Sequence, residues 1–397
     1  MSAAEARARA ETRAVPGGAS SPPRRVLHVI TGLERGGAEN HLAELALGQA
    51  AAGWEVAVAY LKGEPYWGAA LAERGVAVEP LGLRFYGDPL ALARLRRLVR
   101  RIRPDVVHAH LQPAEVYARL ALPAGRRGGP RFVISKHNNG RFFDGNATLA
   151  LAAARWVGRR ADAIIGISDA VRTRVVNEAL AREPGQVQTV HYGVDAEPYL
   201  APDAEGVRRL REEWGAREGT VLFGTAARMV PVKSLETLLE GYALLRREHP
   251  EADTRLVLVG AGPLQAALRE RAEALGIGEH CVWAGFREDM PRVMGALDVF
   301  ALTSLSEGFG LVLIEAMAAG KPVVSTRVGA TPEIVEPGRT GHLVPARDPG
   351  ALALALAACL DPAARAACGR AGRERSLGFT IGRMVAATLR VYAGVLA

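Results

Sequence analysis

The chain alternates short apolar runs, each long enough for one buried strand, with longer segments that repeat apolar residues at helical spacing. In the first half, helices are predicted at 66–74 and 89–103, and a third runs from a glycine turn at 31–39 to about residue 52. Strand, helix and strand in succession are typical of a parallel sheet with crossover helices. The predicted strands are 25–30, 53–60, 76–81, 104–110, 131–140, 161–167 and 188–195.

A turn-rich segment at 193–206, which contains Pro198 and Pro202, interrupts this series and predicts a domain junction. A second strand and helix series follows, so we expect an α/β protein with two Rossmann-like domains. Its predicted helices are 207–214, a segment from Lys233 to about 248, one after 260–263, and 311–319; its strands are 220–226, 255–259, 280–283, 299–302, 322–326 and 341–345. The expected division is a disordered tail at 1–24, an N-terminal domain at 25–193 and a C-terminal domain at 194–380.

The segment 304–324 carries the densest local signals. Its loop, 304–310, follows a predicted strand and opens the helix 311–319. Ligands of open α/β sheets bind at the carboxyl ends of strands, and a helix N-terminus favours anions. Two carboxylates, Glu307 and Glu315, flank this turn. An acid near a helix start can serve the helix dipole alone, which is the structural alternative for Glu315.

The composition indicates the cellular compartment in which the protein is expected. The chain has 397 residues, more than one core usually holds, and its only cysteines are Cys281, Cys359 and Cys368. Three sparse cysteines without metal-ligand spacing fit a reducing cytoplasm. We find no apolar run of 18 residues or more, and residues 1–24 lack the apolar centre of a secretory signal. We therefore expect a cytoplasmic protein.

The net charge of +8 arises in the first half, where residues 1–200 hold 27 basic and 19 acidic residues. A basic excess favours anionic lipid, phosphate-bearing ligands or nucleic acid. The predicted helix 89–103 is amphipathic, with arginines on its polar face. It could touch an anionic membrane at the inner face of the cell membrane, or simply pack on the sheet as a surface helix. Nucleic acid is not expected, because the helix lacks interleaved aromatic residues.

Polar residues follow several predicted strands on what should be one rim. His110 and His137 end two of them, and Gly36 and Gly37 form the turn after the first strand. A histidine at a strand end is often structural or solvated, and the two glycines are weak evidence for a dinucleotide because the full G-x-G-x-x-G pattern is missing.

Taken together, these residues resemble the retaining GT-B glycosyltransferases of family 4, also called group 1. The most specific element is Glu307-Gly308-Phe309-Gly310 with Glu315 eight positions later, an E-x7-E motif. The resemblance covers the chain from about residue 25. It implies two domains that face one another across a cleft, with the final helix, 381–397, returning to the N-terminal domain. The other segments that carry it are 36–39, 105–110, 192–195, 298–300, 322–324 and 333–341.

The resemblance also implies roles for particular residues. Arg228 and Lys233 match positions that clamp the diphosphate, Glu315 the ribose ligand, Glu307 the residue facing the sugar, and His110 the histidine near the reacting sugar. The expected catalytic residues are His110, Arg228, Lys233 and Glu307. The expected donor contacts are Gly36, Gly37, Arg228, Lys233, Gly262, Glu307, Gly308, Phe309, Gly310, Leu311 and Glu315; the acceptor-side candidates are His137, Arg141 and Phe142.

The implied reaction transfers a hexosyl group, with retention, from a nucleotide sugar to a hydroxyl of a glycan, lipid-linked or small-molecule acceptor. A UDP-sugar and a role in cell-envelope glycoconjugates are favoured. No cofactor or metal is expected, since there is no Asp-x-Asp and the clamp cations replace the metal. One departure is Ser234, where the family usually has glycine. The alternatives are a 2-epimerase-like enzyme of the same fold, or an inactive member that binds a membrane surface or a partner.

Overall fold

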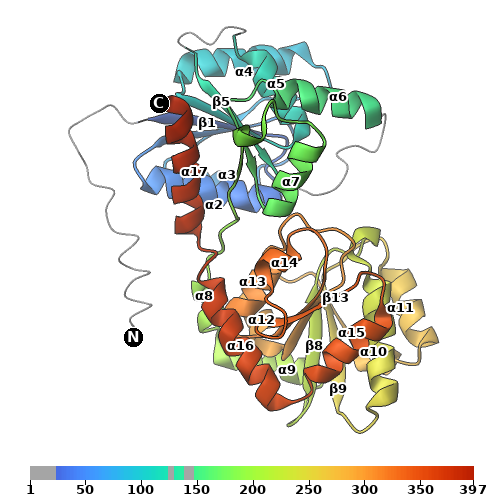
Figure 1. Ribbon diagram of the computed structural model, residues 1–397. Helices are drawn as coiled ribbons and strands as arrows, with labels where there is room; N and C mark the ends of the chain where they lie inside the picture. The colour runs from blue at the N-terminus through green and yellow to red at the C-terminus, as the bar shows by residue number, and fades with distance from the viewer. Residues whose placement is uncertain (1–23, 124–128, 138–146) are drawn as a thin grey trace.

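The computed structural model describes residues 24–123, 129–137 and 147–397. They form two α/β domains, one above the other in Figure 1, each built on a parallel sheet. The expected fold class, two Rossmann-like domains, is confirmed. The acceptor-side candidates Arg141 and Phe142, and residues 1–23 of the predicted tail, lie outside the described residues.

The N-terminal domain has seven parallel strands in the order β3-β2-β1-β4-β5-β6-β7. Helices cover both faces, so the central strands are buried on both sides and read as continuous apolar runs. The strands are β1 Arg25–Ile30, β2 Glu55–Tyr60, β3 Ala77–Pro80, β4 Val106–His110, β5 Arg131–Lys136, β6 Ala163–Gly166 and β7 Val187–Thr189. The helices are α2 Gly37–Ala51, α3 Gly68–Glu73, α4 Pro89–Ile102, α5 Gln112–Ala121, α6 Ala147–Gly158 and α7 Asp169–Asn177.

The C-terminal domain has six parallel strands in the order β10-β9-β8-β11-β12-β13. They are β8 Val221–Ala226, β9 Thr254–Val259, β10 Cys281–Gly285, β11 Val299–Leu302, β12 Val323–Thr326 and β13 Gly341–Val344. The helices of the second half are α8 Glu197–Leu200, α9 Ala204–Glu213, α10 Leu235–Glu248, α11 Gln265–Ala274, α12 Met290–Ala296, α13 Leu311–Ala318, α14 Thr331–Ile334, α15 Pro349–Ala358, α16 Pro362–Ser376 and α17 Ile381–Leu396. Strand order reverses at β1 and at β8, the points where open sheets bind ligands.

The chain passes between the domains twice, and the two crossings lie side by side. Val194 pairs with Thr380 in a single parallel bridge, and a Cβ at Gly193 would be 2.5 Å from the Ile381 Cα. Beyond this point α17 lies along α2 of the N-terminal domain (Figure 1). Gly48 permits the close approach, because a Cβ there would be 2.5 Å from a methyl carbon of Val385.

Two features differ from the sequence prediction. The strand expected at 188–195 ends at Thr189, because the chain must leave the sheet edge to reach the second domain. The second concerns helices that were not predicted, although parallel strands require crossovers such as α5 and α12. They are α5, α6 and α7 in the N-terminal domain and α8, α12, α14, α15 and α16 in the second half of the chain. Among the described residues, no single helix is long and apolar enough to span a bilayer; α15 and α16 meet that test only as a pair bent by 96°.

Candidate functional site

The loop 304–310 joins β11 to α13 at the carboxyl edge of the C-terminal sheet. It packs against the backbone at Gly329, where a Cβ would lie 1.8 Å from the Glu307 carbonyl oxygen. Gly310 has φ +99°, in the left-handed region that favours glycine, and α13 begins at the next residue, Leu311. The loop is therefore held in one shape, with the N-terminus of α13 beside it.

Lys233 and Glu307 form an ion pair within this domain. Lys233 Nζ lies 2.5 Å from Glu307 Oε1, and the Ser304 hydroxyl donates to the same oxygen at 2.6 Å. Both side chains are partly covered, at 24% and 11% exposure. Lys233 is thus held in place by Glu307 while part of its side chain remains accessible to a ligand.

Arg228 lies in the loop after β8. It is exposed and has neither an ion pair nor a side-chain hydrogen bond among the described residues. Gly262 allows the loop after β9 to pack on the adjacent backbone, because a Cβ there would be 2.5 Å from the Met229 carbonyl oxygen. Ser234 has φ +45°, which glycine adopts without cost, and its hydroxyl pairs with that of Thr237 at 2.9 Å. The departure from glycine therefore leaves the turn intact.

Glu315 lies on α13 and contacts the segment between the domains. Tyr199 of α8 hydrogen-bonds to its carboxylate. Burial raises the pKa of Glu315 to about 7, and the bond from Tyr199 offsets only part of that rise. Glu315 thus titrates near neutral pH, while the proximity of Glu315 and burial raise the pKa of Tyr199.

Gly36 and Gly37 lie at the start of α2. A Cβ at Gly36 would be 2.2 Å from Glu39 Oε2, whereas one at Gly37 would meet nothing within 4 Å. The Glu39 carboxylate therefore folds back over the helix N-terminus, where negative charge is favourable. Burial raises the pKa of Glu39. In this conformation the Glu39 carboxylate lies beside Gly36, the N-cap of α2.

His110 and His137 belong to a buried hydrogen-bonded chain of side chains. His110 Nε2 lies 3.0 Å from His28 Nδ1, and His110 Nδ1 lies 3.0 Å from His137 Nε2. The chain ends at Gln49, 2.7 Å from His28 Nε2, and at the Tyr192 hydroxyl, 2.5 Å from His137 Nδ1. His110 has no exposed surface and no free ring nitrogen, so a direct sugar contact would require one of these bonds to break.

The hydrogen bonds along this series of side chains all run in the same donor-to-acceptor direction. Burial lowers the pKa of His28 to about 4 and of His137 to about 3, and lowers that of His110 as well, so the rings are neutral. Gln49 Oε1 can only accept, so His28 donates through Nε2, and His110 and His137 must then each donate through Nε2. Tyr192 donates to His137 and completes the series.

Two comparisons with protein families agree with this arrangement. Residues 35–198 match the model described as Glycosyltransferase Family 4, and residues 207–375 match that described as Glycosyl transferases group 1. A GDP-mannose-dependent alpha-(1-6)-phosphatidylinositol monomannoside mannosyltransferase of Mycolicibacterium smegmatis is 33% identical over 301 residues, 73% of this chain and 76% of that protein.

The chain belongs to glycosyltransferase family 4. The putative glycosyltransferase EpsD of Bacillus subtilis is 29% identical over 318 residues, 78% of this chain and 82% of that protein. Among solved structures, Anabaena Alr3699/HepE in complex with UDP and glucose superimposes with a TM-score of 0.80 at 22% identity, over 94% of this chain and all of that chain. At that identity the likeness supports the GT-B fold alone.

In this family 4 enzyme, the segment between the domains contacts the loop that carries Glu307. His191 stacks on Phe309 with ring centroids 5.4 Å apart, and Tyr192 meets the same ring edge-on at 5.5 Å. His41 of α2 stacks on Tyr192 at 4.0 Å. On the other side of the boundary, Arg35 pairs with Glu288 at 2.5 Å. The N-terminal domain and the connecting segment therefore contact the C-terminal domain both at Phe309 and at Glu288.

Within residues 24–123, 129–137 and 147–397, two groups of side chains have ligand atoms near enough to hold a metal ion, namely His28 with His108 and His110, and Asp169 with His191 and Glu333. In the first group every ring nitrogen already has a hydrogen-bond partner within the protein; the two partners of His108 are Tyr392 and Ser135. In the second, the Glu333 carboxylate accepts two backbone N–H bonds. Neither group needs a metal to satisfy it.

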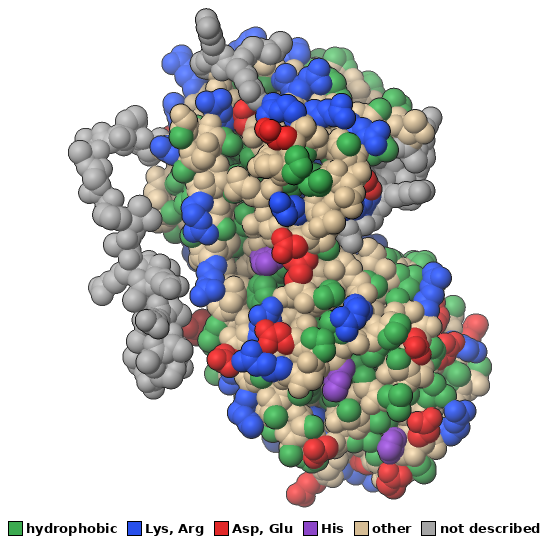
Figure 2. Space-filling model, in the orientation of Figure 1, with side chains coloured by type: hydrophobic (Ala, Val, Ile, Leu, Met, Phe, Trp, Pro, Cys, Tyr) green, Lys and Arg blue, Asp and Glu red, His purple; other side chains and the backbone are tan. Residues whose placement is uncertain are grey.

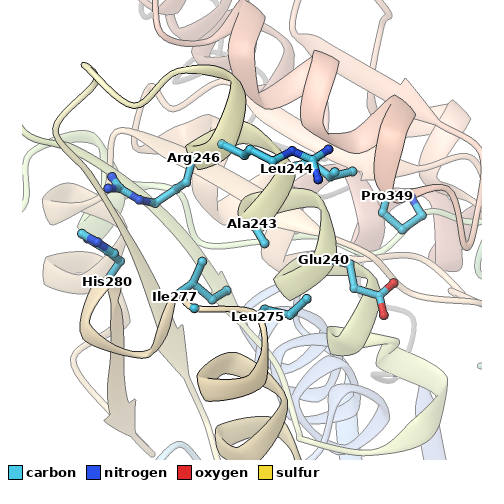
Figure 3. A pocket seen from close by; sticks show the side chains of 10 residues that line it. Glu240, Ala243, Leu244, Arg246, Leu275, Ile277, His280 and Pro349 are labelled. Carbon is cyan, nitrogen blue, oxygen red and sulfur yellow. The ribbon is translucent and has the colours of Figure 1, made fainter.

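A pocket on the outer side of the C-terminal domain lies apart from these residues (Figure 3). It is formed by α10 and the turn after α11, with Arg246 and His280 on one side and Glu240 on the other. None of the predicted site residues lines it.

Sequence reasoning gave no role to Glu333, Ser168 or Tyr199, all of which contact predicted site residues or join the domains. Glu333 had a usable signal, because it belongs to a segment that carries the family resemblance. Tyr199 lies in the turn-rich junction, where no periodicity marks it.

Proposed function

We propose that this protein is a retaining hexosyltransferase that moves a sugar from a nucleoside-diphosphate donor to a hydroxyl acceptor. The observation that carries the proposal is the exposed Arg228, which has no side-chain partner in the part of the chain that the structure describes and lies in the loop that leads to the Lys233–Glu307 ion pair. Two cations in one loop, next to a helix N-terminus, suit the charge that develops on a departing diphosphate.

In the proposed reaction, the acceptor oxygen bonds to the anomeric carbon on the face from which the diphosphate leaves. The bond between that carbon and the phosphate oxygen breaks, and the acceptor proton passes to the departing diphosphate. Lys233 would exchange Glu307 for the phosphate, and Arg228 would bind the same group. Glu307, once released, would face the sugar, where positive charge develops. No cofactor or metal enters this scheme, because these cations supply the positive charge.

The donor contacts we propose beyond these are the glycines on either side of the domain boundary and the ribose ligand. Gly36 and Gly37 would offer the amides of α2 once the Glu39 carboxylate moves away. Glu315 would accept both ribose hydroxyls. His110 and His137 would act through Tyr192, which their hydrogen-bonded chain holds against Phe309. The remaining proposed contacts are Gly262, Gly308, Phe309, Gly310 and Leu311.

The donor base and the acceptor are part of the proposal. The family resemblance favours a UDP-sugar, and HepE was solved with UDP and glucose, whereas the mycobacterial relative is named for GDP-mannose. We propose a glycan or lipid-linked acceptor of the cell envelope and a cytoplasmic location.

We further propose that a basic groove on the N-terminal domain contacts anionic lipid. It lies where β1, β4 and β5 begin, at the sheet edge away from the other domain, and Lys and Arg side chains gather there at the top of Figure 2. Of the described residues that line it, Asp105 is the only acid. Its arginines are Arg25, Arg96, Arg100, Arg103, Arg119 and Arg131. A membrane bound there would lie at the far end of the molecule from Glu307.

The test of the proposed function is release of nucleoside diphosphate over a matrix of UDP- and GDP-sugars and candidate acceptors. Lys233→Ala should lower turnover by about a hundredfold or more, the usual effect of removing one donor to a developing anion. Lys62→Ala is the control, since Lys62 is exposed and bonds only to Tyr86.

Near wild-type turnover in Lys233→Ala would remove the phosphate-clamp assignment. Conversion of the donor without any acceptor would favour the 2-epimerase alternative. A panel of nucleoside diphosphates that leaves the thermal stability unchanged would favour an inactive, surface-binding protein, because a ligand that binds only the folded state must stabilise it.

A further inference from the structure

The Glu333 side chain of the C-terminal domain contacts the first turn of α7 in the N-terminal domain. Glu333 Oε2 accepts the Asp169 N–H at 2.9 Å, and Oε1 accepts the Ala170 N–H at 2.9 Å. The Glu333 side chain is only 17% exposed. One carboxylate therefore binds two adjacent amides across the domain boundary.

The amides at the start of α7 need such a partner. The first N–H groups of a helix have no acceptor within it and carry partial positive charge, so a carboxylate stabilises them. Ser168, the N-cap of α7, satisfies Val171 at 3.1 Å through its hydroxyl oxygen. The caps of this helix are thus divided between the domains, Ser168 from its own and Glu333 from the other.

The Ser168 hydroxyl also donates to the Gly308 carbonyl at 2.9 Å. Gly308 follows Glu307 directly, so the N-terminal domain binds the loop expected to hold the donor. The same hydroxyl accepts from Val171 and donates to Gly308, which fixes its hydrogen toward the loop. Capping of α7 and restraint of this loop therefore share one side chain.

Glu333 is itself fixed on both sides. Arg375 of α16 donates to the carbonyl of Glu333 at 2.6 Å and to that of Ile334 at 2.7 Å. His191 Nε2 lies 3.0 Å from Glu333 Oε2, and its ring stacks on Phe309. The carboxylate is consequently aimed at α7 by its own domain and tied to the donor loop through His191.

We propose that Glu333 is a positioning residue, which holds the two domains together and thereby fixes the 307–310 loop for the donor. This inference rests on the proposed function for its kinetic consequence, but the domain contact itself does not. If Glu333 releases α7, Ser168 moves away from Gly308, and the loop loses its restraint from the N-terminal domain.

The test compares Glu333→Gln with the wild-type full chain. Glutamine has nearly the same shape but only one acceptor oxygen, so its NH2 group faces one of the two amides. We expect the donor KM to rise about tenfold, as for the loss of one hydrogen bond to a charged group. The radius of gyration from small-angle X-ray scattering should increase, while the melting temperature changes by only a few degrees. Glu333→Asp should recover part of the donor KM.

Glu374→Gln is the matched control, because Glu374 is exposed and pairs only with Arg339 of its own domain. Wild-type donor KM and wild-type scattering in Glu333→Gln would overturn the proposal. So would a radius of gyration that changes in the wild type on addition of EDTA, because a cation held by Asp169, His191 and Glu333 would then join the domains instead. If no donor is turned over, the proposed function fails, yet the scattering comparison still decides whether Glu333 joins the domains.

Discussion

Glu315 offers a direct test of how the donor ribose is bound. Burial raises its pKa to about 7, so its carboxyl group is largely protonated below that pH and ionised above it. Two ribose hydroxyls donate better to a carboxylate than to a neutral acid. The ionised fraction rises from roughly one-tenth at pH 6 to roughly nine-tenths at pH 8 for a pKa near 7. The affinity for a nucleoside diphosphate should therefore rise about tenfold across this range.

The assay is isothermal titration with UDP or GDP between pH 5.5 and 8.5. The nucleotide phosphate also titrates near pH 6, so the informative quantity is the ratio of wild-type affinity to that of Glu315→Gln. This ratio should rise with pH, since the variant cannot ionise. Tyr199→Phe should move the midpoint to higher pH, because the bond from Tyr199 lowers the pKa of Glu315.

Thermal unfolding supplies the second readout, with a defined sign. The folded-state pKa of Glu315 lies above the usual value of 4.5, so its contribution to stability is full below about pH 4.5 and is lost as pH rises through about 7. Glu315→Gln should therefore gain stability relative to the wild type between pH 5 and 8. An affinity ratio that stays flat with pH would refute the ribose assignment.

Two further predictions follow from particular contacts. Gly329→Ala should reduce turnover strongly and lower the melting temperature, because the new Cβ would lie 1.8 Å from the Glu307 carbonyl oxygen. Gly338→Ala is the control: its φ of +76° is also positive, as is the +51° of Gly329, but its Cβ would meet nothing within 4 Å, so it should cost only about 1–2 kcal/mol of stability and keep its turnover. Equal turnover in the two glycine variants would contradict a fixed Glu307 loop. At low salt, the wild type should co-sediment with vesicles that contain anionic phospholipid. A double variant in the groove, Arg96→Gln with Arg100→Gln, should co-sediment less. The control double variant, Arg208→Gln with Arg209→Gln, alters exposed arginines of the other domain and should bind as the wild type does. Equal binding by the two double variants would remove the groove from the proposal.

Much of the fold could be predicted from the sequence because each strand is a short apolar run followed by its own turn. This local signal fails where the chain does something that depends on distant residues. Val190 to Val194 read as a strand continuation, but Val194 pairs with Thr380, almost two hundred residues later. The helices α5, α6 and α7 were not predicted for a different reason: they have only 10, 12 and 9 residues, so their apolar periodicity extends over few turns.

The residues of the candidate site also fall into those that local sequence places and those that depend on distant contacts. Lys233 and Glu307 each follow a strand of one sheet, so their position at one edge follows from local order, and the structure brings them within 2.5 Å. Glu333 reaches a helix of the other domain, and nothing in its local sequence indicates which group it meets. Contacts between domains therefore form one part of what the sequence did not predict, and the helices within each domain form the other.

The histidines show why a motif at a strand end does not settle where a side chain points. His110 ends β4 and was expected near the sugar, yet β1 supplies His28 on one side and β5 leads to His137 on the other. Each neutral ring must both donate and accept, and in this series the only arrangement that serves all three rings passes every hydrogen in the same direction. Replacing any one ring by an apolar residue would leave two buried polar atoms without partners, so the three rings stabilise the core only as a complete series. Because its last member is Tyr192, which packs on Phe309, this buried polar core and the loop that carries Glu307 are held by one side chain.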